Sequence, residues 1–421
     1  MEGLADILIS QKAELAARLR QPYVERALPA WAQAQTDLVR VILGPRRAGK
    51  SMLAIHLLQS LGGGGYLNFD DERLAEVTSS DALLAGIDSL YDKPRLLLFD
   101  EIQNFPRWEL MVNRLQREGR RLIITGSNAN LLGAELATHL TGRHQAITLL
   151  PFSFAEALAA EREPATTATR AARLERYLNE GGYPEPLLRG APLAEYLRDL
   201  VRATLLKDIV RRHRLRAPAG LEAFAFHLFS HAAHKLSFRT LAKLGVVTSP
   251  TSATKYLRLI EQSFLVFTLN RFNWKASARV GSDKKLYAID PGLAAQLGIR
   301  PGADWGRLAE NAVACALWHD KLNGDIDVGY WQNPQGEEVD FVVRRRNQIE
   351  ALIQVCWSLA SERTTSREWR ALLKAGEELR CTRLICLHHG PPSKVSVKWQ
   401  RWQGEVELIP IAEWLAQRRR Q

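Results

Sequence analysis

The sequence predicts an α/β protein built on a parallel sheet, followed by a largely helical middle and a second strand-rich region. In residues 38–124, short apolar runs alternate with segments of helical periodicity. This alternation is typical of parallel strands joined by crossover helices. Strands are expected at 38–43, 66–69, 96–99 and 121–124, with helical N-terminal residues 1–36 and a helix over 51–61.

After Pro151 the pattern changes. Residues 152–235 are predicted to be mostly helical, and residues 236–272 to form two short helices, a longer helix and a strand. Strands then return, which indicates a second sheet. They are expected at 328–331, 339–343, 349–356 and 384–387, with helices at 305–318 and 366–379.

Composition indicates a soluble cytoplasmic protein that does not enter a membrane. The four cysteines contain no C-x-x-C pair, which fits a reducing compartment. No apolar run approaches the roughly 20 residues that span a bilayer. The N-terminus carries acidic residues where a signal peptide needs basic ones.

Positive charge is concentrated in the middle of the chain. The net charge is +11, and residues 161–300 contain 23 Lys and Arg against 12 Asp and Glu. A local basic excess is expected of a nucleic-acid-binding surface. A solvated helical face is the alternative explanation.

Residues 44–51 match the phosphate-binding pattern G-x-x-x-x-G-K-[ST] between a predicted strand and a predicted helix. Glycines let the loop direct backbone N–H groups at phosphate oxygens. Lys50 would reach the β- and γ-phosphates, and the Ser51 hydroxyl would ligate Mg²⁺. The cofactors expected are therefore ATP and Mg²⁺. The predicted nucleotide contacts are Gly44, Arg47, Ala48, Gly49, Lys50, Ser51 and Met52.

Two acids follow the strand predicted at 96–99. A carboxylate at the carboxyl end of a parallel strand lies where the magnesium partner belongs. We expect Asp100 to hold Mg²⁺ and Glu101 to orient or deprotonate the attacking water. Two solvated acids at a strand end are the alternative.

A third junction follows the strand at 121–124. Asn128 or Ser127 would contact the γ-phosphate or the attacking water there, unless the segment is a plain turn. Arg143 is a candidate arginine finger, supplied to a neighbouring subunit in one arrangement. An ordinary surface arginine is the alternative.

The ordered set of motifs resembles bacterial and archaeal AAA ATPases with a C-terminal domain of unknown function. The matching pieces are residues 44–51, 68–71, 100–103, 125–127, 149–154, 181–184, 207–209, 306–311 and 339–341. The resemblance implies an AAA-type ATPase core at 1–150, a helical lid at 151–215, a winged helix at 216–280 and a restriction-endonuclease-like domain at 281–421. It also implies a homo-oligomer.

The basic middle fits the expected winged helix. Residues 238–245 would form the first helix of a helix-turn-helix and residues 251–261 the second. The second helix would present Thr251, Ser252, Lys255 and Arg258 to DNA. Residues 262–270 would form the wing, and the cluster from Lys207 to Arg216 would contact phosphates. Packing against the ATPase core or another protein is the alternative.

Nuclease chemistry is not expected from the C-terminal domain. Active nucleases of this fold hold a metal ion with an Asp and an E-x-K pair. Asp340 ends a strand and Glu310 could join it, but the next strand has Gln354 and Cys356 at the E-x-K positions. An amide does not supply the negative charge that Mg²⁺ prefers.

The sequence thus predicts a DNA-associated ATPase. A slow nucleotide-gated switch that signals through a protein partner and an ATP-regulated nuclease are the other hypotheses. Asp100 and Glu101 favour turnover over a pure switch, and Gln354 and Cys356 disfavour cleavage.

Overall fold

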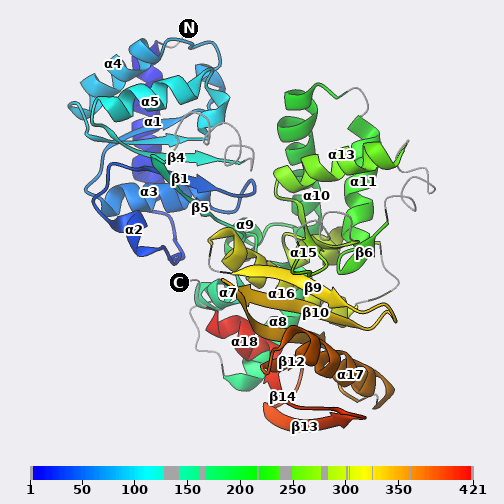
Figure 1. Cartoon of the computed structure of the whole chain (residues 1–421). Coiled ribbons are helices and arrows are strands. Elements are labelled where there is room, and N and C mark those ends of the chain that lie inside the picture. The colour runs from blue at the N-terminus through cyan, green and yellow to red at the C-terminus, as the bar shows by residue number, and fades with distance from the viewer. Residues whose placement is uncertain are drawn as a thin grey trace. The chain divides into compact units, whose positions relative to one another are not determined.

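The computed structural model describes residues 3–418 except 128–141, 162–165, 216–217, 238–248, 276–282, 300–301, 303, 325 and 361. The chain divides into two compact units (Figure 1). Unit 1 contains Met1–Leu150 with Gln262–Phe264, and unit 2 contains Pro151–Glu261 with Leu265–Arg419. No helix in the described part of the chain has the length and apolar character needed to cross a membrane.

Unit 1 is built on a five-stranded parallel sheet with the order β2-β3-β4-β1-β5. The four predicted strands are confirmed within about two residues. The fifth, at the edge beside β1, was not predicted. The bounds are β1 Val39–Leu43, β2 Gly65–Asn68, β3 Leu96–Asp100, β4 Arg121–Gly126 and β5 His144–Thr148.

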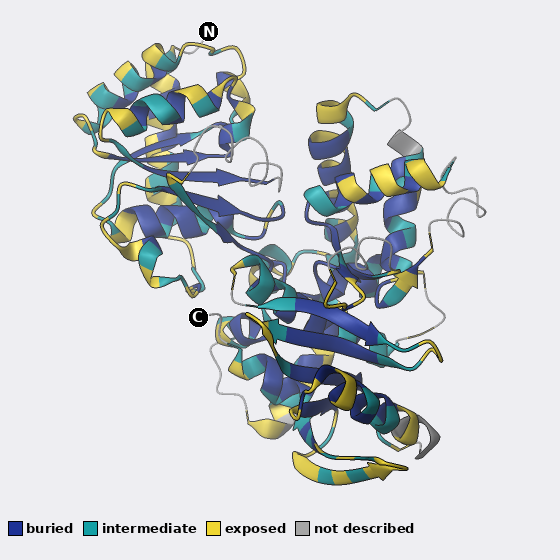
Figure 2. Ribbon diagram, viewed as in Figure 1, coloured by how far each residue is buried: buried dark blue, intermediate teal, exposed yellow. Residues whose placement is uncertain are grey.

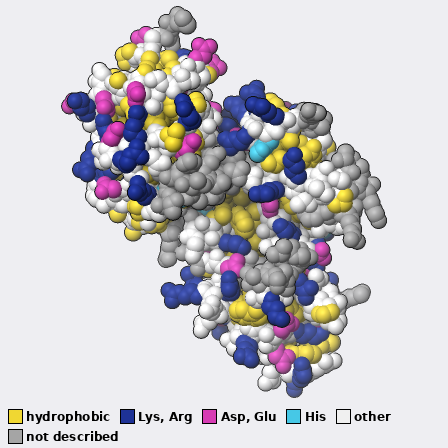
Figure 3. All heavy atoms as spheres, turned by 45° about the horizontal axis from the view of Figure 1, so that its top comes forward, with side chains coloured by type: hydrophobic (Ala, Val, Ile, Leu, Met, Phe, Trp, Pro, Cys, Tyr) yellow, Lys and Arg dark blue, Asp and Glu magenta, His cyan; other side chains and the backbone are white. Residues whose placement is uncertain are grey.

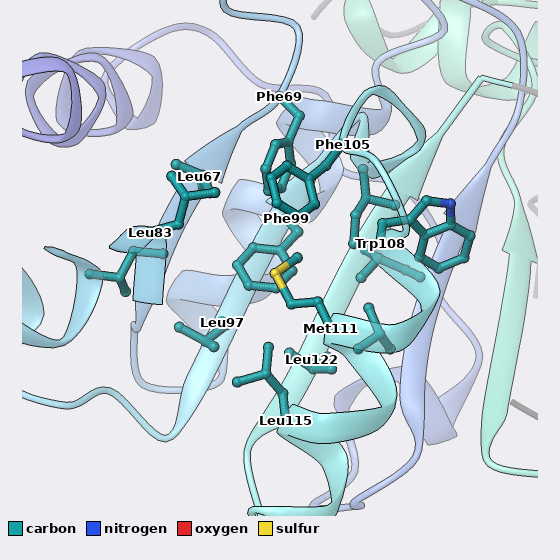
Figure 4. Close-up of a cluster of buried hydrophobic side chains, with 14 of the residues drawn as sticks. Leu67, Phe69, Leu83, Leu97, Phe99, Phe105, Trp108, Met111, Leu115 and Leu122 are labelled. Atoms are coloured by element: carbon teal, nitrogen blue, oxygen red, sulfur yellow. The ribbon is translucent and has the colours of Figure 1, made fainter. Parts of the chain in front are cut away.

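Helices cover both faces of this sheet, so the side chains on both faces of its strands are buried and apolar. This explains why the strands appear in the sequence as continuous apolar runs. Helices α4 (Ser80–Tyr91) and α5 (Trp108–Arg117) pack on one face, together with the start of α1 (Leu4–Leu19). Their side chains enclose an aromatic cluster that includes Phe69, Phe99 and Phe105 (Figure 4). Helix α3 (Lys50–Ser60) covers the other face.

The N-terminal segment is less helical than expected. Of residues 1–36, the described helices are α1 and the single turn α2 (Ala30–Gln33), with irregular chain between them. Pro22 and Pro29 lie in this stretch. Proline removes a backbone donor and disfavours a helical conformation in the residue before it, which explains the break.

The first part of unit 2 is helical, as predicted. Helix α10 continues into a π-helical segment, Leu205–Arg211. π-Helical turns are rare in proteins and frequent at functional positions. The bounds are α7 Phe154–Ala160, α8 Thr167–Glu180, α9 Pro184–Arg189, α10 Leu193–Thr204 and α11 Pro218–Ser230.

A three-stranded antiparallel sheet follows, with the order β6-β8-β7. Its strands are β6 His234–Leu236, β7 Val266–Asn270 and β8 Lys284–Ala288, and α13 (Pro250–Gln262) precedes β7. The helix expected at 238–245 lies outside the described residues. The expected domain boundary at 280/281 does not match the fold, because β8 lies beyond it and pairs with both other strands.

The C-terminal part of unit 2 contains a six-stranded mixed sheet with the order β13-β14-β12-β11-β10-β9. Helix α17 packs on one face, while α16 and α18 pack against the other. Figure 2 shows that the inner strands are buried and that β13 at the edge is largely exposed. The predicted strands and helices are found, but β13 and β14 were not predicted. The bounds are α16 Trp305–Leu322, β9 Asp327–Gln332, β10 Glu338–Arg345, β11 Gln348–Cys356, α17 Glu362–Leu379, β12 Leu384–His388, β13 Ser393–Trp399, β14 Trp402–Pro410 and α18 Ile411–Gln417.

A buried carboxylate joins two helical segments within unit 2. Asp290 caps helix α15 (Pro291–Leu297) by accepting a hydrogen bond from Gly292 N at 2.9 Å. Its second oxygen accepts from Gly182 N at 2.7 Å. The preceding Gly181 has a φ of +79°, and a Cβ there would lie 2.0 Å from the Asp290 carboxylate. The glycine pair at 181–182 is therefore required for this close approach.

Candidate nucleotide site

The phosphate-binding loop connects β1 to α3 in unit 1. Its first glycine, Gly44, has a φ of +145°, and a Cβ at this position would lie 1.9 Å from the Leu149 carbonyl oxygen. Gly49, at the start of α3, has a φ of +96°, and Arg47 is also left-handed with a φ of 61°. The loop thus turns back on itself directly before the N-terminus of an 11-residue helix, where positive dipole ends favour phosphate.

Lys50 is the buried cation of this site, with 3% of its surface exposed. Its Nζ donates to the Pro45 carbonyl oxygen at 2.9 Å and lies 3.3 Å from Glu101 Oε1. The loop backbone and one carboxylate therefore hold the ammonium within the loop, which is the position that a phosphate-binding lysine requires.

Asp100 is held at the end of β3 by two hydroxyl groups. Ser51 Oγ donates to Asp100 Oδ1 at 3.0 Å, and Thr125 Oγ1 donates to the same oxygen at 2.5 Å. Burial raises the pKa of Asp100, and the nearby Glu101 charge raises it further, while the two hydroxyl donors oppose this. Ser51 and Asp100 consequently present a hydroxyl and a carboxyl group side by side.

Glu101 follows in a left-handed conformation, with φ 51° and ψ 47°. Such a conformation is uncommon for a residue other than glycine and persists where surrounding contacts enforce it. Here the Glu101 backbone N–H donates to Thr125 Oγ1 at 2.9 Å, and Gln103 Nε2 donates to Glu101 Oε2 at 2.5 Å. Burial raises the pKa of the Glu101 carboxyl, but the Lys50 and Arg46 charges outweigh it, so the pKa is lowered overall.

The other predicted catalytic residues have different outcomes. Ser127 is buried and accepts a 3.4 Å hydrogen bond from Gln103, the residue that also contacts Glu101. Asn128 lies outside the described residues. Arg143 directly precedes β5, whose first residue pairs with Val39 at the start of β1. It therefore lies at the amino-terminal end of the strands, whereas the loop that follows β1 lies at their carboxyl end. Its action on a neighbouring subunit stays a prediction.

Sequence reasoning missed three residues that position the site. Thr125 lies in the junction that was singled out, but Ser127 and Asn128 were chosen in its place. Gln103 was quoted only as part of a motif. Arg26 was not considered, although it is buried and donates to the Ala48 and Leu150 carbonyl oxygens at 3.3 and 2.8 Å. Threonine, glutamine and arginine are common residues, so only the folded contacts distinguish these three.

The residues present fit a magnesium–nucleotide complex. The left-handed Gly49 and the tight Gly44 turn shape the loop, Lys50 supplies a cation, and Ser51 with Asp100 supplies oxygen ligands. Oxygen ligands suit Mg²⁺, which is usually held by one or two carboxylates together with substrate phosphates rather than by an all-protein cage. Ser51 and Asp100 would hold the ion, and Lys50 with the loop N–H groups would hold the phosphates.

The two basic segments predicted to bind nucleic acid lie close together in unit 2. The first is exposed at Lys207, Arg211, Arg212 and Arg214, and the second at Lys255 and Arg258 on α13. Burial lowers the pKa of His213 most, and the charges of Arg212 and Lys255 lower it further. Both segments therefore place a positive charge near the His213 ring. No described acidic side chain forms an ion pair with any of these six residues. Figure 3 shows dark blue Lys and Arg side chains over this part of the chain.

The residues considered for nuclease chemistry also come together, but with an unexpected partner. Glu310 and Asp340 both contact the ammonium of Lys285, at 2.7 and 3.0 Å. Gln354 accepts a hydrogen bond from Asp340 N at 3.3 Å, and Cys356 is buried. We call Glu310, Glu338 and Asp340 the carboxylate cluster.

Comparison with known proteins agrees with the geometry of unit 1. Residues 36–158 match the family model described as an AAA domain. The five-stranded sheet and its loop are an AAA-type P-loop α/β fold. Residues 171–303 match a domain of unknown function (DUF8612), which ends before α16 begins.

Similar proteins cover most of the chain. An uncharacterized protein of Methanocaldococcus jannaschii is 29% identical over 396 residues, which span 89% of this chain and 88% of that protein. An uncharacterized protein of Haemophilus influenzae is 29% identical over 341 residues, or 77% of this chain and 84% of that protein. Among solved structures, the Walker-type ATPase of Pyrococcus abyssi aligns with a TM-score of 0.43 and 16% identity over 69% of this chain and 96% of that one.

Proposed function

We propose that this protein is an ATPase whose turnover responds to nucleic acid bound on unit 2. The observation that carries the ATPase proposal is the arrangement of Lys50, Ser51, Asp100 and Glu101. They come from the start of helix α3 and the end of strand β3, and direct contacts at 2.5 to 3.3 Å link them to each other or to Thr125 on β4. A binding site alone does not require Glu101.

The proposed roles follow from the local contacts. Lys50 and the loop N–H groups bind the phosphates, and Ser51 and Asp100 hold the magnesium ion, which neutralises phosphate charge when bound. Glu101 orients the attacking water and accepts its proton. Its lowered pKa keeps the carboxylate ionised at neutral pH, and Gln103 and the left-handed backbone fix its direction.

The nucleic-acid proposal rests on six exposed basic side chains. Four lie between Lys207 and Arg214, and the other two, Lys255 and Arg258, lie on α13. Phosphate backbones are bound mainly by Lys and Arg, and the association weakens as salt rises because counterions are released. We infer that α13 and the antiparallel strands β7 and β8 belong to a winged helix, and that the six-stranded sheet with α16 and α17 has a restriction-endonuclease-like fold. The helix followed by an antiparallel hairpin supports the first inference.

Steady-state ATP hydrolysis tests the first part, with and without double- and single-stranded DNA. We expect DNA to raise the rate and Glu101→Gln to abolish hydrolysis while nucleotide binding persists. Hydrolysis that is negligible and indifferent to DNA would replace this proposal with the nucleotide-gated switch, and the search would move to a protein partner.

Salt dependence tests the surface. We expect the double substitution Arg211→Gln and Arg212→Gln to weaken DNA binding and to reduce the slope of log K against log salt by about 0.9 for each phosphate that the variant no longer neutralises. Lys398→Gln is the control for removing an exposed charge outside the two basic segments, because Lys398 is an exposed cation on strand β13. Equal slopes for the wild type and the double variant would show that this surface does not bind the backbone.

A further inference from the structure

Lys285 is a buried lysine that neither the ATPase site nor the basic surface uses. It lies on β8 of the three-stranded sheet, and 3% of its surface is exposed. Its ammonium lies 2.7 Å from Glu310 Oε1, 2.7 Å from Glu338 Oε1 and 3.0 Å from Asp340 Oδ1. One ammonium group therefore contacts all three members of the carboxylate cluster.

Three structural elements bring these groups together. Glu310 lies on α16, Glu338 and Asp340 lie on β10, and Lys285 comes from β8 in a different sheet. An ammonium has three donors and no acceptor, so three carboxylate oxygens satisfy it completely. Burial opposes its charge, but the surrounding carboxylates outweigh burial and raise the pKa of Lys285 well above its usual value.

The remaining bonds of the cluster are directed at protein groups. Asp340 Oδ2 accepts from Val355 N at 3.0 Å, and Glu310 Oε1 accepts from the Tyr287 hydroxyl at 2.8 Å. Glu338 Oε2 pairs with Lys235 at 2.5 Å. The cluster thus has a second cation at its margin, and its central oxygens converge on Lys285.

The neighbouring strand β11 supplies no other cation. Gln354 is neutral, and the contact of Cys356 with Cys386, together with burial, raises the pKa of the Cys356 thiol, which therefore stays uncharged. Asp340 is buried, and Glu310 and Glu338 are half-buried. Three such carboxylates without a central cation would be unstable, because unpaired charge removed from water is strongly unfavourable. Lys285 supplies the central positive charge.

We propose that Lys285 is an internal cation that fills the carboxylate cluster in place of a divalent metal ion and fastens the three-stranded sheet to α16 and β10. While Lys285 is in position, the cluster binds no divalent cation. This inference is independent of the proposed ATPase function, because every group involved lies in unit 2.

Mn²⁺ binding to the nucleotide-free full chain, followed by electron paramagnetic resonance, tests the proposal. We expect the wild type and Asp340→Asn to bind the same amount of Mn²⁺, since the cluster contributes no site in either. Lys285→Ala is expected to gain one bound Mn²⁺ per chain, because it leaves uncompensated carboxylates and removes the side chain between them. Adding Asp340→Asn to Lys285→Ala is expected to remove that gain.

Two results would overturn the proposal. The first is a Mn²⁺ ion that the wild type binds and Asp340→Asn does not, because the cluster would then be a metal site despite Lys285. The second is a folded Lys285→Ala protein that gains no Mn²⁺. If Lys285→Ala does not fold, comparing the wild type with Asp340→Asn still decides whether the cluster binds Mn²⁺ in the presence of Lys285. Whether the cluster gains a Mn²⁺ site without Lys285 is then decided by whether Mn²⁺ in the refolding buffer restores folding of the variant.

Discussion

Asp290 is expected to make the stability of unit 2 depend on pH. Burial raises the pKa of this carboxyl from 3.8 to about 7, although Gly182 and Gly292 donate hydrogen bonds that favour the ionised form. Because the pKa of the folded state is the higher one, the contribution of Asp290 to stability is fully present below about pH 4 and is lost as pH rises through 7. A shift of about three units corresponds to about 4 kcal/mol, as each unit is worth 1.36 kcal/mol.

Urea unfolding of the wild type and Asp290→Asn between pH 4 and pH 8 measures this loss. Tryptophan fluorescence reports mainly on unit 2, because nine of the 11 tryptophans lie in it. The asparagine cannot ionise, so the difference between the two proteins isolates Asp290 from the other titrating groups. We expect the wild type to lose stability relative to the variant as pH rises. A difference that stays constant across this range would refute the reasoning.

Three further predictions concern unit 1. Thr125→Val, which keeps the side-chain shape but removes a hydroxyl that donates and accepts, should slow steady-state ATP hydrolysis by about ten- to a hundredfold, whereas Thr125→Ser should retain most activity. Gly44→Ala should destabilise unit 1 by about 3 kcal/mol or more in thermal unfolding, because its Cβ would strike backbone; Gly62→Ala, with φ +99° and no neighbour within 4 Å, should cost only about 1 kcal/mol. If Arg143 acts on a neighbouring subunit, mixing inactive Arg143→Ala with inactive Lys50→Ala should restore measurable hydrolysis, and a mixture as inactive as its components would contradict that role.

Local sequence patterns were sufficient for the central part of the fold. The strands of unit 1 other than β5 are runs of apolar residues buried on both faces, and such runs are visible without any tertiary information. The edge strand β5, His144–Thr148, escaped prediction because it mixes polar and apolar residues and is only partly buried. β13 escaped for the same reason, since most of its residues are exposed.

The candidate site was predictable only where chemistry requires a fixed spacing. Lys50 and Ser51 belong to a contiguous pattern, and Asp100 and Glu101 follow a recognisable strand. Thr125 lies 25 residues after Asp100 in the sequence, and it is the parallel pairing of β3 and β4 that brings the two side chains into contact. Similarly, nothing around Lys285 in the sequence indicates that it meets Glu310 and Asp340.

The two buried lysines show how the surrounding charges decide whether an ammonium group can serve a ligand. Lys50 and Lys285 are equally buried, each with 3% of its surface exposed. Lys50 faces one carboxylate, that of Glu101, and one backbone carbonyl oxygen. When a phosphate binds at its Nζ, the ammonium loses the contact with the carbonyl oxygen and gains a contact with an anion. Lys285 faces three carboxylates, and an anion brought to its Nζ would meet their negative charge directly. Equal burial therefore leads to different roles, with Lys50 suited to phosphate and Lys285 suited only to holding its own carboxylates together.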